Sequence, residues 1–226
     1  MITAFVMGTS IASAQNSTRE TRNLKGFTSV GFGISGDLQI KIGPVFSVVL
    51  EGDKGDLEEV VTQISGDRLQ IKNDSWSFNF KQKVNVYITM PEIDGLSVSG
   101  SGKATIVDDI KEADGMELSV SGSGKITTAG IVADQLDCSI SGSGNIYTGS
   151  GSVDRGEISI SGSGSYSGES LEIDHLSVGI SGSGNCTCKA GDSIEARVSG
   201  SGNVYYKGDP NVDARVSGSG HVRKAN

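Results

Sequence analysis

Proline and positive charge are both scarce in this sequence. Only 3 of its 226 residues are proline, although 33 are glycine. A disordered chain rich in proline and glycine is excluded because the glycines recur periodically between apolar segments. The 27 Asp and Glu residues outnumber the 19 Lys and Arg residues, the formal net charge is −8, and the basic residues form no cluster. We therefore expect neither nucleic acid nor an anionic membrane as a partner.

A Ser-Gly-Ser-Gly tetrapeptide is repeated through the second half of the chain. Its seven copies begin at Ser99, Ser121, Ser141, Ser161, Ser181, Ser199 and Ser217, so the intervals are 22, 20, 20, 20, 18 and 18 residues. A fixed period of this size is typical of stacked supersecondary units.

Apolar residues occupy the same positions in every copy. Three residues before the first Ser stand Leu96, Leu118, Cys138, Ile158, Val178, Ala196 and Ala214, and one residue before it stand Val98, Val120, Ile140, Ile160, Ile180, Val198 and Val216. This period-2 alternation predicts a strand with one buried face. A third apolar column follows five residues after the first Ser, at Ala104, Ile126, Ile146, Tyr166, Cys186, Val204 and Val222.

Each repeat has too few apolar residues to form a core alone, so stacking has to form it. Helical solenoid repeats need about 30 residues and a 3.6-residue apolar period, and this sequence has neither. We predict an all-β parallel β-helix (β-solenoid) over residues 93–226, with coils of 18–22 residues stacked about 4.8 Å apart. The glycines would supply positive φ or close backbone approach at a corner, and the serines would satisfy backbone groups there.

Residues 23–92 lack the repeat but are rich in expected strands, at "GDLQIKIG", "FSVVLEG" and "KVNVYITMP". We interpret these as hairpins that lead into the solenoid. Between them Asp56 is placed to cap a short helix, with Glu59 three residues later. Because a β-helix exposes unpaired strand groups at its ends, we expect these residues to form a cap continuous with the solenoid as one domain.

The first 14 residues read as a signal peptide. An apolar run ends in Ala12-Ser13-Ala14, an A-x-A cleavage site that would leave a mature chain starting at Gln15. The run is too short to span a bilayer, and no later segment is expected to span one as a helix. We therefore expect an exported protein in the periplasm, at the cell surface or outside the cell.

Three cysteines in an exported chain prompt a search for disulfides. Cys138 and Cys186 lie in core columns two coils apart, which is too far for a bridge. Cys186 and Cys188 are close in sequence but poorly oriented for bridging. The alternative is a Cys-x-Cys metal site, yet only His175 and His221 are available as histidines and no ligand set converges. We expect buried, inert thiols.

Two groups of residues are candidate ligand sites. Trp76, Phe78 and Phe80 share one strand face, and they would serve either as an aromatic platform for sugar rings or, as we favour, as a cover for the open end of the core. The second group is an acidic column seven residues before each first Ser, at Glu92, Asp114, Asp134, Asp154, Asp174 and Asp192.

Carboxylates in register repel one another unless something compensates. Each Asp of the column could accept hydrogen bonds from backbone N–H groups of its own turn. Alternatively, Ca²⁺ could bridge adjacent coils through Asp114, Asp134, Asp154, Asp174 and Asp192. We favour hydrogen-bonded turns and expect no cofactor, with calcium as the alternative.

The whole pattern resembles the family called putative auto-transporter adhesin, head GIN domain, found mostly in Bacteroidetes. The matching stretches are "GFTSVGFGISGDLQIKIG", "VVLEGDKGDLEEVVTQISGDRLQIK" and "VNVYITMPEIDGLSVSGSG", followed by the serial Ser-Gly-Ser-Gly copies. The resemblance runs from about Asn23 to the C-terminus. It implies an exported, right-handed parallel β-helix, and the family offers no catalytic or binding residues to carry over.

Three functions are weighed on this basis. The first is a non-catalytic envelope or surface adhesin or scaffold, whose long faces suit an extended partner, with a glycan as one candidate. The second is a polysaccharide-active enzyme, which we disfavour because no coil carries a loop long enough to wall a cleft. The third is an ice-binding or polymerising solenoid. Ice binding is disfavoured because the threonines form no unbroken array on one face, and polymerisation is opposed by Arg215, His221, Arg223 and Lys224 in the last coil. We expect a monomer or a weakly associated species.

Overall fold

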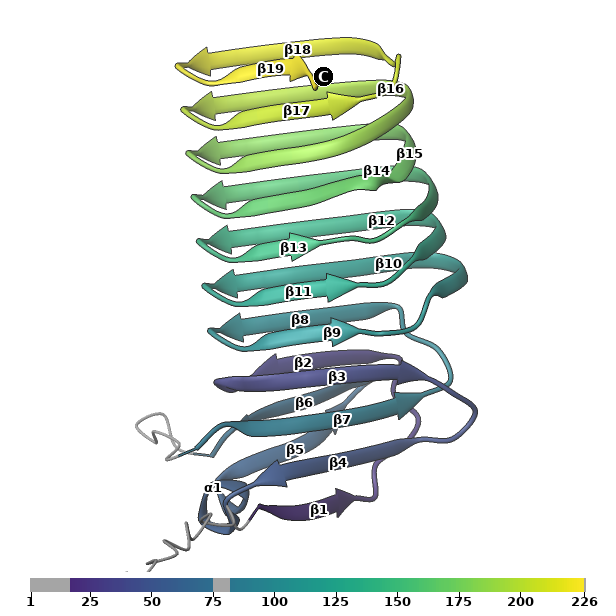
Figure 1. Cartoon of the computed structure of the whole chain (residues 1–226), viewed down its shortest axis with the longest axis vertical. Helices are drawn as coiled ribbons and strands as arrows, with labels where there is room; N and C mark the ends of the chain where they lie inside the picture. Colours follow the sequence, from purple (N-terminus) through teal and green to yellow (C-terminus); the bar gives the residue numbers. More distant parts are fainter. Residues whose placement is uncertain (1–16, 75–81, 226) are drawn as a thin grey trace, which may run out of the picture.

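The computed structural model describes residues 17–74 and 82–225, and almost all regular structure in this part of the chain is β. The strands stack into an elongated solenoid with one short helix near its N-terminal end (Figure 1). The predicted all-β solenoid is confirmed. The handedness of the coil, which the resemblance implied, stays a prediction.

Two parallel sheets run along the solenoid. We call the first the serine sheet, because its strands end in the repeated Ser-Gly. Its strands are β8 (Gly95–Gly100), β10 (Ile110–Gly122), β12 (Ile131–Gly142), β14 (Gly151–Gly162), the second halves of β15 (Ser165–Gly182) and β16 (Asn185–Gly200), and β18 (Asn211–Gly218). We call the second the return sheet; it contains β9 (Lys103–Ile106), β11 (Lys125–Thr128), β13 (Asn145–Tyr147), the first parts of β15 and β16, β17 (Asn203–Lys207) and β19 (His221–Lys224).

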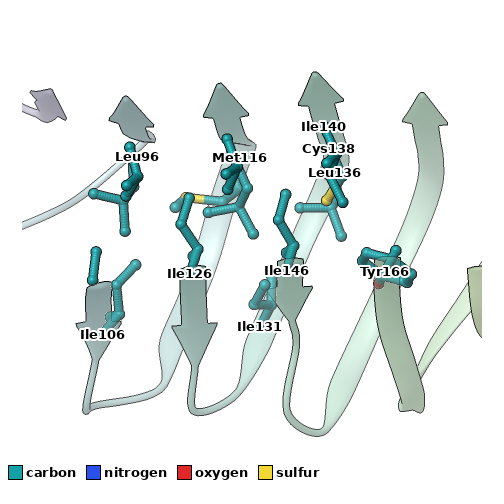
Figure 2. Close-up of a cluster of buried hydrophobic side chains, with 14 of the residues drawn as sticks. Leu96, Ile106, Met116, Ile126, Ile131, Leu136, Cys138, Ile140, Ile146 and Tyr166 are labelled. Atoms are coloured by element: carbon teal, nitrogen blue, oxygen red, sulfur yellow. The ribbon is translucent and has the colours of Figure 1, made fainter. Parts of the chain in front are cut away.

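The register of the strands matches the repeat. Leu118 pairs with Leu96 on one side and with Cys138 on the other, so the first predicted apolar column is one ladder of the serine sheet. Side chains of the two sheets meet between them, as Figure 2 shows for Leu96, Leu136, Ile126 and Ile146. These four side chains are buried. Since burying one such side chain stabilises the fold by about 1.5–3 kcal/mol, stacking supplies the core that a single coil lacks.

The two glycines of the tetrapeptide have different structural roles. The first glycine has a positive φ in every copy, from +88° at Gly100 to +126° at Gly218. At the second glycine the restriction is space: a Cβ on Gly164 would lie 2.4 Å from the Gly144 carbonyl oxygen. The coils approach this closely because the corner is hydrogen-bonded between coils, for example from the Ser163 N–H to the Gly142 carbonyl at 2.8 Å.

The solenoid continues below the repeats. The strands β2 (Ser29–Gly33) and β3 (Gly36–Ile42) lie parallel to β8 and β9 and form the next coil. The strands β6 (Arg68–Asn73) and β7 (Val84–Met90) lie parallel to β2 and β3 and form the coil after that. The coil of β2 and β3 is therefore placed between two segments that follow it in the sequence (Figure 1).

Antiparallel strands close the N-terminal end. The strand β4 (Ser47–Gly52) pairs with β7, β1 (Thr18–Arg22) pairs with β4, and β5 (Val60–Ser65) pairs with β6. Among the described strands here, only β5 and β6 form a hairpin, with Gly66 at φ +66° in its turn. The expectation of hairpins is wrong for β3, β4 and β7, because β7 continues the parallel stack and β4 pairs with its outer edge.

The helix α1 (Lys54–Glu58) begins one turn earlier than predicted. Asp53 is its N-cap, with extended backbone and a side chain that accepts a hydrogen bond from the Gly55 N–H at 2.9 Å. Asp56 lies inside the helix and is buried, and its Oδ2 accepts a hydrogen bond from the Gln82 N–H. The predicted capping role of Asp56 is therefore wrong. In residues 17–74 and 82–225 no helix is long and apolar enough to cross a membrane, and the predicted signal peptide (1–14) lies outside these residues.

Candidate functional site

The outer face of the serine sheet is the most regular surface of the molecule. Alternate residues of β12, β14, β15 and β16 in this sheet point outward, while their neighbours are buried. Strand pairing places the outward residues in four columns: Gln135, Arg155, His175, Ser193 and Asn211; Asp137, Glu157, Ser177, Glu195 and Asp213; Ser139, Ser159, Gly179, Arg197 and Arg215; and Ser141, Ser161, Ser181, Ser199 and Ser217. A ligand that follows the solenoid axis along the fourth column meets a serine on every coil from β12 to β18.

A hollow of about 590 Å³, which we call the serine groove, follows the last two columns from β12 to β18. Gly179 lies in it, at a position where neighbouring coils carry Ser159 and Arg197. The backbone does not require glycine there, because an added Cβ would have Ser159 Oγ as its nearest neighbour at 3.9 Å, and φ is outside the left-handed region. The missing side chain therefore leaves space in the serine groove at this coil, and the backbone conformation does not account for it.

Two arginines follow Gly179 in the same column toward the C-terminus. Arg197 forms an ion pair with Glu195, and Arg215 Nη2 lies 3.5 Å from Asp213 Oδ2. Both guanidinium groups are exposed, with side-chain accessibilities of 57% and 70%. Because guanidinium groups have five N–H donors, these arginines keep donors available for a ligand after pairing with their own carboxylates.

A second hollow of about 670 Å³, the acidic groove, lies beside the serine groove over the first two columns. Its carboxylates come from a column that the sequence analysis did not single out: Asp137, Glu157, Glu195 and Asp213. These residues stand four positions before each first Ser. The signal that would have found them is the period-2 alternation, continued two residues further toward the strand start.

The acidic groove also brings together a histidine, a serine and a nearby aspartate that sequence reasoning missed. His175 Nδ1 lies 3.0 Å from Ser193 Oγ, and His175 Nε2 lies 4.0 Å from Asp192 Oδ2. A catalytic triad has the opposite arrangement, with the carboxylate on Nδ1 and the hydroxyl on Nε2 within hydrogen-bond distance. The His175 and Asp192 side chains are also 58% and 73% exposed. This set is a surface cluster rather than an assembled triad.

The predicted acidic column lies at the corner where the chain turns onto the serine sheet. Asp114, Asp134 and Asp154 are exposed and in register, because the residues on either side of them pair between coils. A hollow of about 340 Å³ adjoins these three carboxylates. Asp174 is half-buried, and Asp192 lies within an irregularity of the register between Ala190 and Ser193. Among the described residues no three His, Cys, Asp or Glu side chains are grouped closely enough to hold a metal ion, and calcium binding stays an untested alternative.

Removing two charges from this column is expected to stabilise the protein. The double variant Asp134→Asn, Asp154→Asn keeps hydrogen-bond acceptors and relieves like-charge contacts, each worth roughly 0.2–1 kcal/mol between facing residues. We expect the melting midpoint to rise by about 2–4 °C. We also expect millimolar Ca²⁺, compared with a chelator at fixed ionic strength, to leave the wild-type midpoint unchanged. A rise with Ca²⁺ that the double variant abolishes would instead establish a calcium site.

The aromatic residues Trp76, Phe78 and Phe80 lie within 75–81, outside the described residues. Both interpretations of this stripe stay predictions.

The three cysteines belong to the core. Cys138, Cys186 and Cys188 are free and buried, as predicted. Burial, reinforced by the charge of Asp137, raises the pKa of the Cys138 thiol. A hydrogen bond with Cys188, together with burial, raises the pKa of the Cys186 thiol. The thiolate is the nucleophilic form, so the Cys138 and Cys186 thiols are expected to be unreactive in the folded protein, and burial shields all three.

Thiol titration checks this placement. With Ellman's reagent at pH 8 the native protein is expected to react at less than about a tenth of the rate of free cysteine, because its thiols are buried. After unfolding in guanidinium chloride all three should react. Rapid labelling of the native protein at any of the three positions would contradict a core position.

Comparison with proteins of known structure supports this description. A putative adhesin from Bacteroides fragilis NCTC 9343 superposes with a TM-score of 0.87 at 21% identity, covering 94% of this chain and 98% of that protein. A putative adhesin from Parabacteroides distasonis ATCC 8503 gives a TM-score of 0.76 at 21% identity, with the same coverage. A putative lipid binding protein from the same strain gives 0.74 at 23% identity, covering 93% of this chain and 97% of that one. At these identities the likeness shows the fold.

Family membership comes from the sequence itself. No match was found among curated proteins. A family model matches residues 26–210, which include most of the cap and all but the last of the Ser-Gly-Ser-Gly copies. The chain therefore belongs to the family described as putative auto-transporter adhesin, head GIN domain.

Proposed function

We propose that this chain is an exported, non-catalytic binding module of the cell envelope or surface, and that it holds an extended, hydroxyl-rich polymer such as a glycan in the serine groove. The observation that carries the proposal is Gly179, whose missing side chain opens the groove although the fold does not require glycine there. The description of the family as adhesins and the resemblance to structures called putative adhesins support a binding role.

The chemistry of the groove suits such a ligand. Each serine hydroxyl both donates and accepts hydrogen bonds, which matches the hydroxyl groups of a sugar. The serines recur on consecutive coils, so a polymer lying along the axis makes the same contact several times. Individually weak contacts then combine through a high effective concentration. Arg197 and Arg215 add cationic donors toward the C-terminal coil, where acidic groups of the polymer would bind.

A polysaccharide array tests this proposal. The wild type is expected to bind at least one extended polymer, and Gly179→Glu is expected to weaken that binding by about tenfold or more, because the new side chain occupies the groove and its carboxylate competes with the polymer for Arg197. The control is Thr127→Glu, which places the same side chain on the outer face of the return sheet and is expected to bind like the wild type. Equal loss in both variants, with both folded, would argue against the serine groove as the site.

The alternative is a polysaccharide-active enzyme, favoured by the contact between His175 and Ser193 in the acidic groove. Depolymerisation and ester-hydrolysis assays on the purified protein separate the two functions. We expect no turnover above buffer. Turnover that Ser193→Ala abolishes would replace the binding module by a hydrolase.

A further inference from the structure

The C-terminal coil differs from every coil before it in the exposure of its inward side chains. Val212 and Val216 of β18 are 45% and 42% exposed. Their counterparts one coil earlier, Ile194 and Val198 of β16, are 1% and 2% exposed. Within residues 17–74 and 82–225, β18 pairs only with β16, so its other edge presents free backbone N–H and C=O groups. Such an edge is ready to accept another strand.

The sequence of this edge is self-complementary. Val212-Asp213-Ala214-Arg215-Val216 reads as apolar, acidic, small, basic, apolar. If β18 meets a second copy of itself antiparallel with Ala214 facing Ala214, then Asp213 faces Arg215 of the other copy and Val212 faces Val216. Facing side chains in an antiparallel pair point to the same side. The valines would therefore complete the open core, and the charges would meet on the outer face.

The charges already have the required arrangement. Asp213 and Arg215 of one chain lie 3.5 Å apart at Oδ2 and Nη2, on the outward side of β18. A second copy related by a two-fold axis would extend this pair to four alternating charges. Antiparallel pairing of identical strands closes after two copies, because each copy offers the same edge to the other. The contact therefore gives a dimer and no filament.

We propose that two copies of this chain associate tip to tip through antiparallel pairing of β18. The cationic residues of β19 do not prevent this contact. Arg223 stacks on the Tyr205 ring and its Nη2 donates to Tyr205 Oη, while Lys224 forms an ion pair with Asp209. Because β18 and β19 lie side by side in the last coil (Figure 1), the two-fold arrangement also brings the two β19 strands near each other, and their cations lower the affinity of the dimer. The dimer would present two serine groove faces along one extended body.

Charge exchange tests the pairing. Sedimentation equilibrium of the wild type over a concentration series is expected to show a reversible monomer–dimer equilibrium. Asp213→Arg and Arg215→Asp should each weaken the dimer about tenfold or more, since either change brings like charges together twice in the two-fold arrangement. The double variant Asp213→Arg, Arg215→Asp should recover the wild-type constant within about threefold. An equimolar mixture of the two single variants should also dimerise, because their charges complement one another.

The matched control is three coils away. Glu157 occupies the same outward column on β14, where both edges of the strand are paired. Because three coils about 4.8 Å apart separate it from Asp213, Glu157→Arg should leave the dimer constant within about threefold of the wild type. Unchanged circular dichroism and melting midpoints establish that the variants are folded. A wild type that stays monomeric at every concentration, that forms filaments, or whose dimer survives both single variants would overturn the proposal, as would a folded double variant that stays monomeric.

Discussion

Replacing Gly164 by alanine is expected to destabilise the protein by about 3 kcal/mol, at the upper end for overpacked sites. The Cβ would lie 2.4 Å from the Gly144 carbonyl oxygen and 2.5 Å from Ile140 Cγ2. The carbonyl belongs to the backbone of the preceding coil and cannot move without breaking the corner. The denaturation midpoint in guanidinium chloride, measured with its m-value, gives the change in the free energy of unfolding.

The control for this variant is another glycine to alanine change. At Gly179 an added Cβ has nothing closer than 3.9 Å, so Gly179→Ala should alter stability by no more than about 0.5 kcal/mol. If the two substitutions cost the same, the second glycine of the repeat is not a packing requirement, and our explanation of the Ser-Gly-Ser-Gly corner fails.

Truncating Tyr166 is the second change with a large expected effect. This side chain is fully buried in the third apolar column, and its hydroxyl lies 2.9 Å from Thr148 Oγ1. Tyr166→Ala is expected to cost about 3–5 kcal/mol, the range for removing an aromatic ring from a core. Tyr166→Phe keeps the ring and should cost about 1–2 kcal/mol, because the Thr148 hydroxyl loses its partner.

The same unfolding measurement applies to both Tyr166 variants. A loss below about 1 kcal/mol for Tyr166→Ala would show that the coils do not share a packed core. A larger loss for Tyr166→Phe than for Tyr166→Ala would show that the hydroxyl pair, and not the ring, stabilises this coil.

The sequence predicted the repeat region in detail because one local rule governs it. A period of 18–22 residues fixes which residues stack, and period-2 alternation fixes which of them point inward. The pairing of Leu118 with Leu96 and Cys138 follows directly from those two rules. In such a region the strand pairing and the inward-facing positions of one coil predict those of the other coils.

The cap was predicted less well because its pairing is not local. The coil of β2 and β3 carries no Ser-Gly-Ser-Gly copy and lies between strands that come later in the chain. The start of helix α1 also depends on a contact between residues far apart in the sequence. Asp53 and Asp56 are both residue types that cap helices. The hydrogen bond from the Gln82 N–H to Asp56 Oδ2, made across 26 residues, engages the carboxylate of Asp56 and leaves the cap to Asp53.

The candidate site was hidden by its position on the outward face. The sequence shows that Gly179 stands where earlier copies have a serine. The sequence alone does not say whether the backbone requires a glycine there or whether the surface has space at that position. Only the structure shows that an added side chain would be tolerated there and that a groove passes over the position. The acidic column Asp137, Glu157, Glu195 and Asp213 was visible in principle, since it shares the alternation of the apolar columns.

Binding along several coils has a consequence that binding at one point does not have. A polymer that follows the serine groove gains a contact with each added repeat until the groove is filled, so its affinity depends on length. A ligand recognised at a single pocket reaches full affinity as a monomer or dimer.

The most direct measurement is therefore the dissociation constant of a length series of oligosaccharides cut from the polymer that binds on the array, determined by isothermal titration calorimetry. The proposal predicts that affinity rises by about tenfold or more from the shortest to the longest members and then levels off, and that Gly179→Glu removes this gain. Equal affinity for short and long members, or a length dependence that Gly179→Glu leaves intact, would contradict binding along the serine groove.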